Sequence, residues 1–476
     1  MVGLSQADAP LVAALCTCAT RQHAAFYTPG HKRGQGISSL HRTVFGEDVF
    51  RVDLPELPEL DDLFAPESVI LAAQQLAAQA FGAEQTWFLV NGSTGGVEAA
   101  LLATCHPGER VLVPRNAHQS VLSGLILSGA VPVWMTPVYE SDWQLSLGIR
   151  AADIAAALEQ YRDIKAVVVV SPTYEGVCSN ISEIAAVVHS HDIPLIVDAA
   201  HGPHFAFHPD LPPSALSGGA DIVIHSAHKV LAAFTQAALL HVQGTRCDRT
   251  RLSQSLRITQ SSSPSYLLLG SLDAARHQMA NRGQALMAKT LILAQMARQQ
   301  LGCPVLNVSQ GGIFQQDLTR LTVDVTAMNT TGFDADVWLH ERGVTAELPT
   351  LRQLTFIISL GNTVSDIEQL VQALKQLPKT GFVDRPLPVL MDSVSQPGVS
   401  PRDAFFAPTE TCTVESAIGR FSADTVSIYP PGIPNLMPGE PITAQTLEGL
   451  KIARHSGAHL SGLSDPSLQT MRVLRG

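Results

Sequence analysis

Residues 86–104 read TWFLVNGSTGGVEAALLAT and join an apolar run to a helical pattern through a glycine-rich turn. The run Thr86–Val90 has the length and composition of a buried strand, whereas Gly96–Thr104 carries apolar side chains at the spacing of a helix. The turn between them, NGSTGG, combines three glycines, two hydroxyls and the free N–H groups of a helix start, which make a candidate anion site. A plain glycine-rich turn is the alternative that this stretch alone leaves open.

The same alternation of strands and helices continues after this stretch. Short apolar runs predict strands at Arg110–Val113, Val131–Met135, Ala166–Val170, Leu195–Asp198, Asp221–His225 and Ala237–Val242. Helical spacing recurs at Gln119–Ser128 and Ile181–His191. Strands that are apolar on both faces and alternate with helices indicate a mostly parallel sheet covered on both sides. The predicted fold class is therefore α/β.

The rest of the chain predicts smaller units. A helical pattern at Arg282–Leu301 precedes strand patterns at Leu318–Val325 and Gln353–Ser359 and a helix at Val364–Gln376. A proline-rich stretch then indicates a linker. We expect an N-terminal arm at 1–50, a large domain at 51–290, a small α+β domain at 291–383, a linker at 384–402 and a C-terminal α+β domain at 403–476.

Three side chains that follow predicted strands carry reactive groups. Asp198 ends a strand at the sheet edge where such folds bind ligands, although Asp is also a common helix N-cap. Lys229 follows the strand DIVIH with apolar neighbours, so it is a candidate for a lowered pKa and a Schiff base; an ordinary surface lysine is the alternative. His118 follows a third strand, where it either stacks on a ligand or begins a helix in water.

The order of these residues is more specific than any one of them. An anion cradle, a strand-end carboxylate and a strand-end amine follow one another along a single predicted sheet. Pyridoxal phosphate (PLP) needs these groups for its phosphate, its pyridinium nitrogen and its aldehyde. The sequence therefore predicts a PLP enzyme with the cofactor on Lys229 and His118 beside its ring.

Composition excludes other classes. The formal net charge of −11 makes nucleic acid an unexpected partner. Apolar runs stay below the roughly 20 residues that span a bilayer, and no basic region precedes the apolar run Leu11–Leu15, so neither a membrane segment nor a signal peptide is expected. Seven cysteines scattered over 476 residues suit a reducing compartment, so we expect a cytoplasmic protein.

Motifs distributed along nearly the whole chain point to a family. They are YTPGHK (27–32), LDDL (60–63), NGSTGG (91–96), VPRNAH (113–118), SPTYEGV (171–177), DAAHGPHF (198–205), SAHK (226–229), SSSPSY (261–266), YPPGIP (429–434) and PGE (438–440). With these motifs the chain resembles the Orn/Lys/Arg decarboxylases, which are PLP-dependent enzymes of fold type I, the aspartate-aminotransferase type. Its length is similar to that of the shorter members, which lack an N-terminal receiver-like domain.

The resemblance implies roles for the matching residues. Lys229 would carry PLP as a Schiff base, Asp198 would pair with the pyridinium nitrogen, and His118 would stack on the ring. His201 and His228 would line the site, with His228 or another nearby acid donating the proton to Cα, and Glu440 would contact the distal amine of the substrate. The further cofactor-binding residues would be Ser93, Thr94, Gly95, His201, Ser226, His228 and, from a second subunit, Ser262.

The implied reaction is decarboxylation of a basic L-amino acid to its amine and CO2, a step of polyamine biosynthesis. Arginine or lysine is expected before ornithine, with agmatine, cadaverine or putrescine as the product. The enzyme would be a homodimer or a larger homo-oligomer with shared active sites. An aminotransferase, a β-eliminating lyase or a PLP-binding regulator without turnover remain alternatives.

The sequence departs from the family pattern at three positions. Ala199 stands where Glu is common, Gln119 where Lys is common, and Ser262 where Thr is usual. The first two bear on assembly, rate or substrate preference, and Ser262 keeps the hydroxyl.

A metal site is the remaining alternative. His201, His204 and His208 have HxxHxxxH spacing, but Pro203 and Pro209 argue against a continuous helix. We expect no metal.

Overall fold

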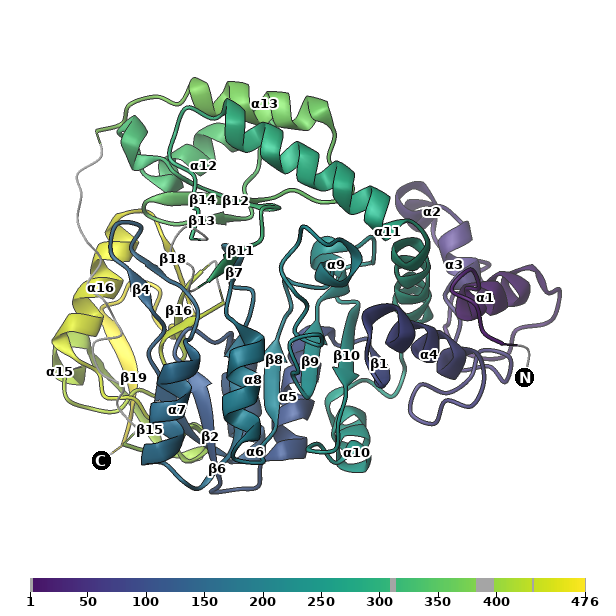
Figure 1. Ribbon diagram of the computed structural model, residues 1–476, viewed down its shortest axis with the longest axis horizontal. Coiled ribbons are helices and arrows are strands. Elements are labelled where there is room, and N and C mark those ends of the chain that lie inside the picture. Colours follow the sequence, from purple (N-terminus) through teal and green to yellow (C-terminus); the bar gives the residue numbers. More distant parts are fainter. Residues whose placement is uncertain (1–2, 309–313, 382–397, 430–431, 476) are drawn as a thin grey trace.

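A seven-stranded sheet forms the centre of the computed structural model, which describes residues 3–308, 314–381, 398–429 and 432–475 (Figure 1). Its strand order is β1-β10-β9-β8-β6-β2-β3. The strands are β1 (Gln85–Leu89), β2 (Arg110–Pro114), β3 (Val131–Met135), β6 (Ile164–Val170), β8 (Leu195–Asp198), β9 (Ile222–His225) and β10 (Ala238–Val242). Every strand that the sequence predicts for this sheet is present, with ends shifted by at most two residues.

The sheet is mostly parallel, with one strand reversed. From β9 to β3 all neighbours are parallel, whereas β10 is antiparallel to both β1 and β9. The connection from β9 to β10 contains only the one-turn helix α9 (Ala227–Val230), which does not carry the chain back across the sheet as a parallel crossover requires. Apolar periodicity places residues 237–242 in a sheet but says nothing about their direction.

Alternate side chains of each strand enter two different cores. On β6, Val167 and Val169 pack in the core covered by α4 (Val69–Phe81), α7 (Ala151–Gln160), α8 (Ile181–His189) and α11 (Tyr266–Gln300). Ala166 and Val168 pack in the core covered by α5 (Gly92–Thr104), α6 (Gln119–Ser128) and α10 (Arg249–Thr259). This alternation is the period of two expected for a strand buried on both faces.

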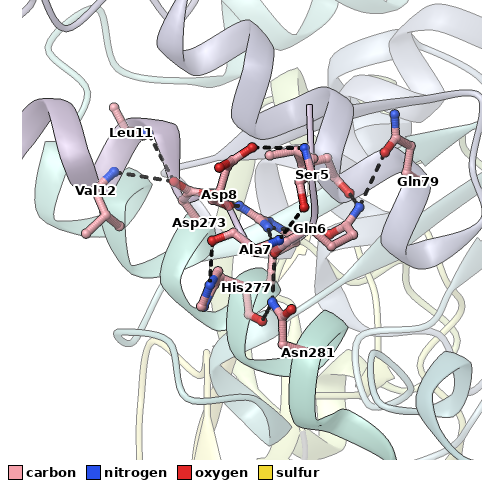
Figure 2. A network of polar contacts seen from close by, with 12 residues as sticks. Ser5, Gln6, Ala7, Asp8, Leu11, Val12, Gln79, Asp273, His277 and Asn281 are labelled. Atoms are coloured by element: carbon pink, nitrogen blue, oxygen red, sulfur yellow. Dashed lines mark hydrogen bonds and ion pairs between the residues drawn. The ribbon is translucent and has the colours of Figure 1, made fainter. Parts of the chain in front are cut away.

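The N-terminal segment is tied to α11 by buried polar groups (Figure 2). The segment comprises α1 (Pro10–Thr20), α2 (Ser39–Phe45) and α3 (Asp48–Val52). Asp273 Oδ2 accepts hydrogen bonds from the N–H groups of Leu11 (3.0 Å) and Val12 (3.3 Å), so a carboxylate stabilises the N-terminus of α1. Arg276 pairs with Asp273 and donates to the backbone oxygen of Asp8 at 2.7 Å.

The long helix α11 connects the central sheet to a smaller sheet. It begins at Tyr266, so the predicted start at Arg282 is wrong; the buried Asp273 and Arg276 interrupt the apolar pattern of its first half. The predicted boundary at residue 290 falls inside this helix, because Met287 packs in the large core while Leu293 packs in the small one. The small unit contains β12 (Arg320–Asp324), β13 (Leu348–Pro349), β14 (Gln353–Ile357), α12 (Gly332–His340) and α13 (Val364–Lys375).

The C-terminal elements lie at the opposite end of the molecule from α1 (Figure 1). They are α14 (Pro401–Phe406), β15 (Thr409–Thr413), α15 (Val414–Ala417), β16 (Val426–Tyr429), β17 (Pro434–Leu436), α16 (Ala444–His455), β18 (His459–Ser461) and β19 (Thr470–Leu474). Residues 384–397 of the predicted linker lie outside the described residues. Of the helices in the described part of the chain, none has the length and apolarity needed to cross a membrane.

Candidate active site

The glycine-rich turn is the first turn of α5. The helix begins at Gly92, so the predicted start at Gly96 is four residues too late. Gly92 has a φ of 71°, which favours glycine, and a Cβ at Gly96 would lie 2.7 Å from Leu89 Cδ1. The glycines therefore allow the helix to start directly behind β1, with first-turn N–H groups that have no intrahelical acceptor.

Two hydroxyls meet at this helix start. Ser226, which is fully buried directly after β9, donates through Oγ to Ser93 Oγ at 2.8 Å. Ser93 also lines a small cavity, and the other residues that line it are Asn116, His118, Val170, Pro172, Tyr174, Asp198, Ala200, His201 and Lys229. The predicted anion cradle thus opens into the same cavity as the predicted reactive lysine.

Lys229 lies near the end of α9 with its amine directed at an imidazole. Its Nζ is 2.9 Å from His201 Nε2 and 5.4 Å from the centroid of the Tyr174 ring. Burial lowers the pKa of the Lys229 ammonium, and the carboxylate of Asp198 acts in the opposite direction. The surface-lysine alternative is therefore excluded by the position of the side chain.

Asp198 is the last residue of β8 and is 5% exposed. The N–H of Ala200 donates to Asp198 Oδ1 at 3.2 Å, so the carboxylate makes the local turn contact common for Asp while still lining the cavity. Because β8 and β9 are parallel neighbours, Asp198 and the Ser226–Lys229 segment leave the same edge of the sheet.

His118 is the N-cap of α6. Its Nδ1 accepts from the N–H of Ser120 at 3.2 Å and lies 2.9 Å from Ser120 Oγ. Since Nδ1 is an acceptor, the neutral ring carries its proton on Nε2. Burial lowers the pKa of His118, with a further lowering from Lys229 and an opposing effect of Asp198. The ring is half-buried at the cavity wall.

Two residues of the site were not expected from the sequence. Tyr174 packs against His201 with ring centroids 4.6 Å apart and lines the cavity. Arg320 is fully buried, and its Nη2 donates to the backbone oxygen of His201 at 3.1 Å. Tyr174 belongs to SPTYEGV, one of the motifs that indicate the family, so the sequence could have suggested it. Arg320 comes from a separate unit, and no local sequence pattern distinguishes it.

Family models match both parts of this chain. The model of the Orn/Lys/Arg decarboxylase major domain matches residues 9–328, and the model of the C-terminal domain of the same family matches residues 387–469. The chain belongs to the Orn/Lys/Arg decarboxylase family. An arginine decarboxylase of Bacillus anthracis is 37% identical over 100% of this chain and 99% of its own length. An arginine decarboxylase of Bacillus subtilis is 36% identical over 99% of this chain and 99% of its own length.

A solved structure shows the same fold. Lysine decarboxylase A from Pseudomonas aeruginosa superimposes with a TM-score of 0.85 at 23% identity, over 98% of this chain and 80% of that one. The predicted family, the α/β fold class and the reaction class, decarboxylation of a basic amino acid, are thereby confirmed. The family implies PLP as the cofactor.

The residues of this Orn/Lys/Arg decarboxylase fit PLP chemically. One cavity is lined by an amine (Lys229), a carboxylate (Asp198) and a flat neutral imidazole (His118), and the Ser93 hydroxyl at a helix start adjoins them. These groups match the aldehyde, the pyridinium nitrogen, the ring face and the phosphate of PLP.

Other predicted residues lie outside this cavity. Thr94 is exposed and Gly95 is buried against Thr259, on the first turn of α5. Ser262 is exposed between α10 and α11, and its contribution to a second subunit stays a prediction.

Glu440 Oε2 accepts from Arg115 and from the N–H of Met437, each at 2.9 Å, so within this chain its carboxylate joins the VPRNAH segment to the C-terminal unit. Its contact with the substrate stays a prediction.

The three histidines of the HxxHxxxH pattern bind different partners. His201 faces Lys229, His204 Nε2 lies 3.1 Å from Asp317 Oδ2, and His208 Nδ1 accepts from the N–H of Asp210 at 3.1 Å. Within the described ranges, no three His, Cys, Asp or Glu side chains form a group that could hold a metal ion.

Proposed function

We propose that this protein holds PLP on Lys229 and decarboxylates arginine to agmatine and CO2. The observation that carries the proposal is the convergence of Lys229, Asp198 and His118 on one cavity at the carboxyl edge of the parallel strands. The choice of arginine rests on two arginine decarboxylases that match this chain over at least 99% of their own length. The proposal includes a role for each of these residues in the reaction.

When bound, PLP supplies an electron sink for the electron pair that departing CO2 leaves behind. Asp198 places a negative charge where it favours a protonated ring nitrogen, which strengthens that sink. His118 presents the flat face of its neutral ring, and Ser93 and Ser226 present hydroxyls to the phosphate. Lys229, whose pKa burial lowers, supplies an amine that is more often unprotonated than a surface lysine.

His228 is the proposed proton donor to Cα. Its Nδ1 lies 3.1 Å from the backbone oxygen of Ala237, and a carbonyl accepts only, so Nδ1 carries the proton of the neutral ring. Nε2 is then the atom that takes up and delivers a proton. Burial lowers the pKa of His228, which favours release of that proton.

We further propose a homodimer or larger assembly with shared sites. Ser262 is exposed, and Phe26, next to the YTPGHK motif, is 94% exposed on an isolated chain. A second copy that covers Phe26 and receives Ser262 accounts for both. Activity measured during dilution, beside the sedimentation coefficient, tests this: full activity of separated subunits would contradict shared sites.

The proposed compartment is the cytoplasm. All seven cysteines are free thiols, which suits a reducing environment.

The function is tested by competition between substrates. The PLP-loaded protein is incubated with equimolar arginine, lysine and ornithine, and the amines are identified by mass spectrometry. We expect agmatine to be the main product. Cadaverine or putrescine as the main product would overturn the choice of arginine, and stoichiometric pyridoxamine phosphate without any amine would overturn decarboxylation.

A further inference from the structure

A buried arginine from the small unit that follows α11 contacts His201, a residue of the proposed PLP site. Arg320 is the first residue of β12 and has no exposed surface. Its Nη2 donates to the backbone oxygen of His201 at 3.1 Å and lies 3.4 Å from His201 Nδ1. On the other side of the same ring, Nε2 lies 2.9 Å from Lys229 Nζ. The imidazole of His201 therefore stands between a guanidinium and the reactive lysine.

The guanidinium of Arg320 is held in this place by a buried acid. Asp317 Oδ2 lies 3.8 Å from Arg320 Nη1 and 3.1 Å from His204 Nε2. Asp317 Oδ1 accepts from both the N–H (2.9 Å) and the Oγ1 (2.7 Å) of Thr319. Every one of these side chains is buried. The ion pair with Asp317 and the hydrogen bond from Nη2 to the His201 backbone oxygen orient Arg320 toward the His201 ring.

This arrangement selects one form of the His201 ring. A guanidinium has only donors, so Nδ1 facing Arg320 must be an acceptor and the single proton of the neutral ring is on Nε2. A proton on Nε2 points at Lys229 Nζ, and it is accepted only by an amine that has a free electron pair. A Lys229 ammonium would instead force the proton onto Nδ1, against the donors of Arg320.

We propose that Arg320 is a positioning residue that fixes His201 as the Nε2–H tautomer and thereby keeps Lys229 as a neutral amine. The inference rests on the proposed function, because only a neutral amine attacks the aldehyde of PLP. In that condensation a carbon–nitrogen double bond forms, the carbon–oxygen bond breaks, and both amine hydrogens leave with the oxygen as one water.

The charges around the two groups act in both directions. Burial lowers the pKa of Lys229 and, to well below its ordinary value, that of His201. Arg320 lowers the pKa of both, whereas Asp198 and Glu347 raise that of Lys229. The charged and titratable groups around this pair are His118 before α6, Tyr174 after β6, Asp198 on β8, His204 before η1 (Phe205–Phe207), His228 on α9, Arg320 on β12 and Glu347 before β13.

The test measures how fast the full-length protein, freed of cofactor, takes up PLP between pH 6 and 10. Uptake is followed by absorbance, and the attachment point is established by borohydride reduction and peptide mass spectrometry. For Arg320→Met we expect the midpoint of the pH profile to rise by about one pH unit, so that uptake at neutral pH slows about tenfold. Arg320→Lys, which keeps a partner for Asp317, should give a smaller rise in the same direction.

The matched control is Arg298→Met. Arg298 donates to the backbone oxygens of Arg320 (2.6 Å) and Leu306 (3.1 Å) and so holds the same segment, but it makes no hydrogen bond to His201 or Lys229. We expect its midpoint to equal that of the unmodified protein. An equal rise in Arg298→Met and Arg320→Met would show a merely structural effect and overturn the proposal.

A double variant separates the tautomer from a direct charge effect. If Arg320 acts mainly through His201, then His201→Gln also raises the midpoint, and adding Arg320→Met raises it by less than the sum of the two single shifts. Fully additive shifts would mean that Arg320 acts on Lys229 through its charge alone, against the proposal. If Arg320→Met does not fold, Arg320→Lys decides: a raised midpoint supports the proposal and an unchanged one contradicts it. Failure of the unmodified protein to form an adduct on Lys229 would instead overturn the proposed function.

Discussion

Two pairs of buried or half-buried histidines lie in this fold, in contrasting surroundings. His118 and His201 line the cavity of Lys229 and face charged groups, among them Asp198 and Arg320. His225 and His241 contact each other across β9 and β10, with Nδ1 of one 3.1 Å from Nε2 of the other. The neighbours of the second pair are the hydroxyl of Thr86 and the ring of Phe81.

Burial lowers the pKa of all four histidines, that of His225 to about 3. A lowered pKa therefore reports burial in both pairs and does not by itself identify a site. What distinguishes the first pair is a cavity together with an amine and a carboxylate. Substitutions at the two places should therefore separate the chemistry of the site pair from the packing of the core pair.

The largest effect is expected from Lys229→Ala. Without the amine the cofactor has no attachment point, and we expect no detectable agmatine by mass spectrometry. The control is Lys165→Ala, which removes an exposed lysine of β6 and should leave turnover unchanged. Normal turnover of the Lys229 variant would show that the site has been misassigned.

The next largest effect is expected from Asp198→Asn. This change keeps the shape of the side chain but removes the charge that favours a protonated ring nitrogen, so kcat should fall by at least about a hundredfold, a scale typical of losing a catalytic proton or charge contact. Asp210→Asn, an exposed change, should have no effect on kcat. Steady-state kinetics of both variants, with cofactor content measured by absorbance, distinguishes lost chemistry from lost binding.

A smaller effect is expected where the C-terminal unit touches His118. A Cβ added at Gly432 would lie 3.0 Å from His118 Nε2, so Gly432→Ala must displace the ring. We expect kcat to fall roughly tenfold, as small misplacements in active sites do. Gly361→Ala, where a Cβ has open space, is the matched control. Equal rates for both variants would mean that the C-terminal unit does not position His118.

The smallest effect on activity is expected from His241→Gln in the core pair, where the change should alter stability instead. His241 is neutral when folded, because burial lowers its pKa well below 6.5, but it binds a proton when unfolded below that pH. The contribution of neutral His241 to the free energy of unfolding is therefore fully present above about pH 6.5. It falls by up to about 1.4 kcal/mol per pH unit as the pH decreases below that value. His241→Gln, which does not titrate, should lose less stability between pH 7 and pH 5.5 in urea unfolding. An identical acid loss in both proteins would exclude His241 as its cause.

Much of the site follows from the sequence because its residues lie at strand ends. Asp198 and Lys229 occupy the positions where parallel strands deliver side chains to a common edge, and the hydroxyls of the glycine-rich segment lie at a helix start. Periodicity does not report strand direction, so the reversal of β10 was not predicted. It also missed the first half of α11, where Asp273 and Arg276 pair inside the core.

Arg320 could not be found from local pattern. It lies 119 residues from His201 along the chain, and its contact depends on how the small sheet packs against the loop after β8. Glu440 illustrates the reverse case, since the motif that contains it is recognisable but its carboxylate contacts Arg115 in this chain. Both outcomes depend on tertiary packing that no sequence window contains.

Locating the cofactor on the chain tests whether Lys229 is its attachment point. The protein is incubated with PLP, reduced with borohydride, digested and analysed by peptide mass spectrometry. We expect one modified peptide, with the pyridoxyl group on Lys229, and loss of the label when arginine is added before reduction. A stable label on another lysine, or a Lys229 label that arginine does not displace, would contradict it.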